Sequence, residues 1–170
     1  MVAQSDNNAQ VMMRPALLAL ILAPSLAPIP AHAEPPQTLE TLGEALFFDP
    51  NLSQNRTQSC ASCHDPNTAF ADPRGAASPG DDGVSLGDRN APTAMYAALV
   101  PEFHLDKDGL PTGGLFHDGR AAGLAEQAAG PPLNPIEMGM ADEAALAARL
   151  WENPDYVAAF GAIWGPEVWD

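Results

Sequence analysis

The amino-acid sequence predicts a mainly α domain with long loops. Apolar residues recur at helical spacing in short segments such as 39–47 and 156–164. The 18 prolines and 14 glycines favour irregular connections between these segments. In Cys60-Ala61-Ser62-Cys63-His64, two cysteines three apart precede a histidine, which is the attachment signature of a c-type haem. Because a cofactor can organise loops that lack a core, we expect a c-type cytochrome-like haem domain.

The cysteine motif favours covalent haem over two alternatives. Cys60 and Cys63 would form thioethers with the porphyrin, and His64 would ligate the iron on the proximal side. A redox disulfide usually opens a helix after a strand, and no strand pattern precedes these cysteines, which are the only two in the chain. A zinc site needs about four ligands. Downstream of the motif, only His104 and His117 could add nitrogen donors.

The remaining elements follow from caps and breakers. We expect a first helix over 39–47, capped by Thr38 or Thr41 and ended by Asp49-Pro50, and a helical turn at the cysteine motif. The region 65–93 shows no regular element, and loops of this length are usually functional or wrap a ligand. Downstream, the apolar run at 94–100 is ambiguous in type, and 106–114 is a turn-rich connection. Three helices are expected after it. They are a helix over 121–129 ended by Gly130-Pro131-Pro132, a helix capped by Asp142 and running to Trp151, and a last helix after Asn153-Pro154.

The charge balance restricts the partners. With 22 acidic and 7 basic residues the net charge is −15, so no basic face is available to neutralise nucleic-acid phosphates. The acidic surface suits partners with basic patches, such as an electron donor, although a solvated surface without a partner is equally compatible.

The N-terminus has the features of an export signal. Arg14 precedes an apolar run over 16–26, and Ala31-His32-Ala33 is a small-x-small cleavage site. We therefore expect a signal peptide over 1–33 and a haem domain over 34–170. The apolar run is too short to span a bilayer, so no membrane span is expected after cleavage. Export agrees with the haem motif, because c-type haem is attached outside the bacterial cytoplasm; the predicted location is the periplasm.

Five further stretches of the sequence form a recognisable series. They are LGEALFFDPNLS (42–53), CASCHDPNTAFAD (60–72), GDRNAPTAMYAA (87–98), FHDGRAAGLAEQAAGP (116–131) and NPIEMG (134–139). Together they resemble one protein family, the bacterial di-haem cytochrome c peroxidases and their MauG-like relatives. They match the N-terminal half of that family, which carries the peroxidatic haem.

The resemblance implies a reaction. Hydrogen peroxide would bind the haem iron opposite the proximal histidine, and a nearby carboxyl would move a proton between the two peroxide oxygens. Electrons would come from a small cytochrome or cupredoxin through a second haem on a C-terminal domain.

The family's functional residues transfer to matching positions of this chain. Cys60, Cys63 and His64 correspond to the haem anchors and the proximal ligand. Glu126 resembles the catalytic glutamate; the alternative is a solvent-facing helix charge. Arg120 matches the family's Asp-Gly-Arg and is expected to hold a haem propionate or a loop carboxylate.

The resemblance also suggests calcium. Asn90, in Arg-Asn-x-Pro-Thr, resembles the side-chain ligand of a calcium ion at the domain interface. A turn-forming asparagine is the alternative.

The sequence departs from the family pattern in three places. His117 stands where a tryptophan is common, and a surface histidine in a turn is the preferred interpretation. The loop 65–90 contains no histidine or methionine, which resembles members whose peroxidatic haem is open without prior reduction. The chain has no second CxxCH, so we expect one haem per chain, in a truncated or split protein or one that works with a separate second-haem domain or as a homodimer.

Three functions are compatible with the sequence. A peroxidase that reduces hydrogen peroxide is preferred. A single-haem electron-transfer cytochrome c without catalytic activity is the alternative, and it would need a sixth iron ligand such as Met138, Met140, Met95 or His104. A MauG-like enzyme that oxidises a partner protein is the third, and the sequence does not separate it from the first.

Overall fold

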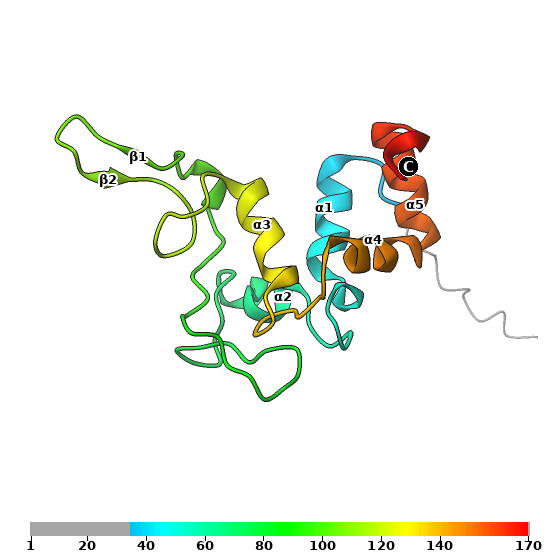
Figure 1. Ribbon diagram of the computed structural model, residues 1–170, viewed down its shortest axis with the longest axis horizontal. Helices are drawn as coiled ribbons and strands as arrows, with labels where there is room; N and C mark the ends of the chain where they lie inside the picture. The colour runs from blue at the N-terminus through cyan, green and yellow to red at the C-terminus, as the bar shows by residue number, and fades with distance from the viewer. Residues whose placement is uncertain (1–34, 170) are drawn as a thin grey trace, which may run out of the picture. The chain divides into compact units, whose positions relative to one another are not determined.

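The computed structural model describes residues 35–169, so the predicted signal peptide lies outside the described residues. Within that range no helix is long and apolar enough to cross a membrane. The helices are α1 (Leu39–Phe48), α2 (Cys60–Cys63), α3 (Leu124–Leu133), α4 (Glu143–Trp151) and α5 (Pro154–Trp164), and the strands are β1 (His104–Leu105) and β2 (Pro111–Thr112) (Figure 1). Short 3₁₀ turns cover Pro50–Leu52, Pro66–Thr68, Ala97–Leu99 and Pro166–Trp169.

The predicted caps of two helices are confirmed, and a third helix has a side-chain cap that was not predicted. The Thr38 hydroxyl accepts a hydrogen bond from the Thr41 N–H and begins α1, which ends at Asp49. The Asp142 carboxylate accepts from the Ala145 N–H at 2.7 Å and begins α4. Asn153 caps α5 in the same way through the Asp155 N–H. Each cap satisfies a backbone donor that has no partner inside the helix.

A small apolar core joins α1 to the C-terminal helices. Leu42 on α1 is buried against Tyr156 and Ala159 on α5. The surrounding positions add Ala45, Leu46, Leu150, Phe160 and Ile163. The Tyr156 hydroxyl lies 3.0 Å from an oxygen of Asp49, so the one polar atom of this core donates a hydrogen bond. Helices α1, α4 and α5 therefore form one helical group (Figure 1).

Helix α3 differs from the prediction at both ends. It begins at Leu124, after the extended Gly123, and continues through Pro131 and Pro132 to Leu133. The expected stop at Gly130 was wrong: both prolines lie in the last turn of α3, where each removes one backbone hydrogen bond without preventing the helix from reaching Leu133. The last carbonyls are also satisfied: Met138 and Met140 donate their N–H groups to Pro131 and Pro132.

The connection around 106–114 contains a hairpin that the sequence did not reveal. His104 pairs with Thr112 and Leu105 with Pro111 in an antiparallel register. The Asp106 carboxylate accepts hydrogen bonds from the Asp108 and Leu110 N–H groups and closes the turn. This small sheet adds to the expected helical architecture.

The core makes a testable prediction about stability. Replacing Leu42, 2 % exposed, by alanine should lower the free energy of unfolding by about 2–5 kcal/mol, because a buried leucine leaves a cavity. Leu39→Ala on the same helix is the control, since Leu39 is 58 % exposed. Urea unfolding measures both; equal losses would show that α1 does not pack through Leu42.

Candidate haem-binding site

The cysteine motif forms the single helical turn that was predicted. The Ser59 N–H donates to the Ser62 hydroxyl at 3.0 Å, and the His64 N–H donates to the Cys60 carbonyl at 2.9 Å. This turn places Cys60, Cys63 and His64 together. Both cysteines are half-buried and have free thiols. Burial raises the pKa of the Cys60 thiol.

His64 is oriented by the loop that follows it. Its Nδ1 lies 3.0 Å from the Phe70 carbonyl oxygen, which can only accept a hydrogen bond, so Nδ1 carries the proton. The loop reverses because Ala69 and Phe70 both adopt left-handed backbone conformations, and the Phe70 N–H returns to the Asp65 carbonyl at 2.8 Å. Nε2 of His64 keeps its lone pair, which is the usual arrangement of a metal-ligating histidine.

These residues fit a covalently attached haem. Two free thiols lie one helical turn apart, and the adjacent imidazole has one nitrogen fixed by a carbonyl and the other available to iron. The donor set of two thiols and one imidazole matches the needs of c-type haem, whereas a structural zinc ion requires a fourth ligand. Among residues 35–169, no group of three or more His, Cys, Asp or Glu side chains is arranged to hold a metal ion.

An arginine that the sequence analysis did not select lies beside the attachment turn. The Arg74 guanidinium binds both carboxylate oxygens of Asp72, and its Nη2 lies 3.4 Å from the Cys63 sulfur. The Arg74 hydrogen bonds hold the pKa of the buried Asp72 carboxyl far below its ordinary range. The Asp72–Arg74 pair therefore fixes a positive group next to the second cysteine.

Glu126 lies in the first turn of α3 and is exposed. One of its carboxylate oxygens accepts a hydrogen bond from the Ala122 N–H at 2.8 Å. A carboxylate in this place stabilises the start of the helix, where unpaired N–H groups and the helix dipole favour negative charge. The catalytic role of Glu126 remains a prediction.

The other predicted residues meet in one exposed cluster. Arg120 forms an ion pair with Asp118 at 2.8 Å, and its guanidinium stacks 3.6 Å above the centre of the Phe116 ring. His117 Nε2 donates to the Asn90 carbonyl at 2.9 Å. The Asn90 side-chain amide donates to the carbonyl of Ala91, its neighbour. The calcium and propionate contacts expected of Asn90 and Arg120 remain predictions.

Glu137 is a carboxylate that the sequence analysis did not select. It is half-buried, and the next residue and Met140 are almost completely buried. Burial raises the pKa of the Glu137 carboxyl and the Asp88 charge adds to the rise, whereas the Asn134 hydrogen bond and the Arg120 charge oppose it. Glu137 lies in the stretch NPIEMG (134–139), but the sequence of so short a segment does not show which of its side chains are buried.

Comparisons with known proteins identify the family of this chain. The family model described as di-haem cytochrome c peroxidase matches residues 37–170. The methylamine utilization protein MauG of Paracoccus denitrificans is 53 % identical over 160 residues, which cover 88 % of this chain and 41 % of the relative. Cytochrome c peroxidase Ccp of Escherichia coli is 38 % identical over 133 residues, covering 78 % and 26 %.

A solved structure also matches. The diheme peroxidase BthA from Burkholderia thailandensis aligns with a TM-score of 0.73 and 42 % identity, over 79 % of this chain and 34 % of that protein. The chain thus spans well under half the length of these relatives. Since the family model covers nearly all of the described residues, the chain belongs to the di-haem cytochrome c peroxidase family.

Proposed function

We propose that residues 34–170 form a peroxide-reducing domain with one covalent haem c, attached through Cys60 and Cys63 and ligated by His64. The observation that carries this proposal is the attachment turn, with two free thiols and a His64 whose Nδ1 donates to the Phe70 carbonyl. Family membership supports the reaction: hydrogen peroxide takes up two electrons and two protons and gives two molecules of water.

The haem and the chain would contribute different parts of this reaction. The haem, when bound, would supply the iron position for peroxide and accept electrons from a donor protein. The chain must supply a base that takes the proton from one peroxide oxygen and returns it to the other. Such a group works best when burial shifts its pKa toward neutral pH.

Of the two candidate carboxylates, Glu137 fits this role better than Glu126. Its half-buried position raises its pKa, as a group that exchanges a proton near neutral pH requires. Glu126 is exposed and already accepts a backbone hydrogen bond at the start of α3. We therefore assign the proton transfer to Glu137 and a helix-capping role to Glu126.

The remaining partners are part of the same proposal. A signal peptide over 1–33 would deliver the chain to the periplasm, where a small cytochrome or cupredoxin would donate electrons. The net charge of −15 suits a donor with a basic patch. A second haem group would come from a further domain or from another chain. Calcium at Asn90 belongs to this proposal too.

The electron-carrier alternative is not favoured. A carrier needs a strong sixth iron ligand. His104 lies exposed on β1 with Nδ1 hydrogen-bonded to the Glu102 carbonyl. Met138 and Met140 are buried on either side of Gly139, in the segment that carries Glu137. The relatives are named as peroxidases or as MauG proteins.

Replacing His64 by glycine tests the haem ligand. We expect His64→Gly to retain the covalent haem, because both thiols remain, but to change the ferric absorption and EPR spectra through loss of the proximal imidazole. Mass spectrometry measures attachment. His104→Gly is the matched control and should keep the wild-type spectrum, and an unchanged spectrum in His64→Gly would refute the assignment.

Two glutamine variants separate the carboxylates. Glu137→Gln should slow the reaction of the ferric protein with hydrogen peroxide by roughly 10²-fold or more, because the amide cannot accept the proton. Glu126→Gln, which keeps an oxygen that can accept the Ala122 N–H, should react at nearly the wild-type rate. Stopped-flow absorption measures both rates. A slow Glu126→Gln variant beside a Glu137→Gln variant with nearly the wild-type rate would assign the proton transfer to Glu126 instead.

The raised pKa of Glu137 also predicts a pH dependence. The ionised carboxylate is the active base, so the reaction rate should decrease as the pH drops through the pKa of Glu137. Because burial raises this pKa, the decrease should occur at a higher pH than the usual glutamate pKa of about 4.3. The charged groups that act on this carboxyl are Arg120 and Asp88. Glu137→Gln should remove this acid limb; a limb that persists unchanged would assign it to another group.

A further inference from the structure

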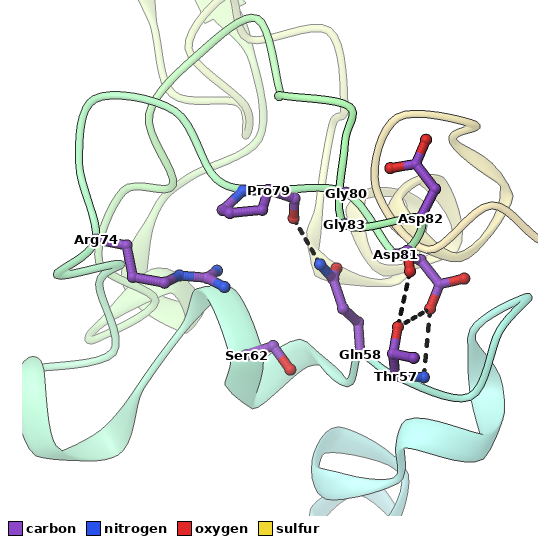
Figure 2. A pocket seen from close by; sticks show the side chains of 9 residues that line it. All are labelled: Thr57, Gln58, Ser62, Arg74, Pro79, Gly80, Asp81, Asp82 and Gly83. Atoms are coloured by element: carbon purple, nitrogen blue, oxygen red, sulfur yellow. Dashed lines mark hydrogen bonds between the residues drawn. The ribbon is translucent and has the colours of Figure 1, made fainter.

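Three distant segments of the chain meet at Asp81. They are the loop 53–58 before the attachment turn, the loop 79–83, and the segment 134–140 that carries Glu137. Asp81 is 6 % exposed, so its carboxylate must be compensated by hydrogen bonds. Figure 2 shows Asp81 at the edge of a hollow that Gln58, Ser62 and Arg74 also line.

The Asp81 carboxylate holds the loop that leads into the attachment turn. One oxygen accepts the Asn55 N–H at 2.6 Å, and the other accepts the Thr57 hydroxyl at 2.5 Å and the Thr57 N–H at 3.3 Å. Figure 2 shows the Thr57 contacts. Burial alone would raise the pKa of Asp81, yet hydrogen bonds from the Ser53 and Thr57 hydroxyls and from backbone N–H groups outweigh it and lower the pKa. The ionised form therefore makes these contacts at neutral pH.

The backbone of Asp81 holds Glu137. The Asp81 N–H donates to the Glu137 carbonyl at 2.7 Å, and the Gln54 N–H donates to the Met138 carbonyl at 2.8 Å. Gly80 approaches so closely that a side chain there would lie 2.9 Å from the Ile136 carbonyl oxygen. The segment with Glu137 is thus bound by both loops at once, and the Asp81 carboxylate binds those loops to each other.

We propose that Asp81 is a positioning residue for the peroxide reaction, because it fixes the Glu137 segment relative to the haem-attachment turn. Asn55 and Thr57 lie three to five residues before Cys60, so a displaced 53–58 loop moves the anchor of the haem. The same displacement releases the Gln54 contact to Met138 and shifts the Glu137 carboxyl. This inference rests on the proposed role of Glu137.

Asp81→Asn in the haem-loaded chain tests the proposal. The amide keeps one acceptor but presents N–H groups to a site built from donors, so the loop contact weakens. We expect the peroxide reaction to slow roughly tenfold, as is typical of groups that orient a reactive site from outside it. Asp82→Asn is the matched control: the Asp82 carboxylate is exposed and, among residues 35–169, accepts hydrogen bonds only from Val84 and Ser85 in its own loop.

A double-mutant cycle separates positioning from general destabilisation. If Asp81 acts through Glu137, Asp81→Asn should slow the reaction in the wild-type background but not in the Glu137→Gln background. Equal slowing in both backgrounds would overturn the proposal. A wild-type rate in Asp81→Asn beside a slow Glu137→Gln would also overturn it. A wild-type rate in Glu137→Gln would instead refute the proposed role of Glu137.

Fluoride binding to the ferric haem gives a readout without peroxide. A protonated carboxyl near the bound fluoride favours binding, so the pH midpoint of fluoride affinity reports on Glu137. Asp81→Asn should move this midpoint, whereas Asp82→Asn should leave it in place; an unmoved midpoint in Asp81→Asn contradicts the proposal. Should Asp81→Asn fail to fold, Thr57→Val removes only the hydroxyl contact and is expected to move the midpoint in the same direction.

Discussion

The hydrogen bonds to the buried Asp81 carboxylate hold the loop before the cysteine motif against the loop 79–83. The apolar core around Leu42 belongs to α1 and α5, and few apolar side chains are buried between residues 53 and 140. In that region the buried groups include polar ones such as Ser53, Gln58, Asp72 and Asp81. Because a buried polar group is costly unless it is paired, these contacts specify a particular loop arrangement.

The irregular loops of this region hold one another in place through hydrogen bonds. The loop 53–58 before the attachment turn, the loop that orients His64 and the segment with Glu137 are each held by a backbone hydrogen bond to another segment of the chain. A covalent haem would add the apolar surface that this region lacks. The loops and the cofactor would then stabilise each other, which couples haem attachment to the geometry of the site.

The sequence predicted the features that depend on neighbouring residues and missed those that depend on burial or on contacts between distant segments. Cys60, Cys63 and His64 were found because haem attachment requires a fixed spacing, and Thr38 and Asp142 because a cap acts on its own helix. Glu137 was not selected because a short segment does not reveal which carboxylate becomes buried. The hairpin of β1 and β2 was missed because strands of two residues show no alternation. Asp81 was missed because its partners lie far along the chain.

The most direct measurement is the absorption and EPR spectrum of the ferric haem-loaded chain before and after hydrogen peroxide is added. The account predicts a high-spin haem, five-coordinate or water-ligated, whose spectrum changes promptly with peroxide. A low-spin spectrum with a second protein ligand, unchanged by peroxide, would contradict the peroxidase function and support the electron carrier.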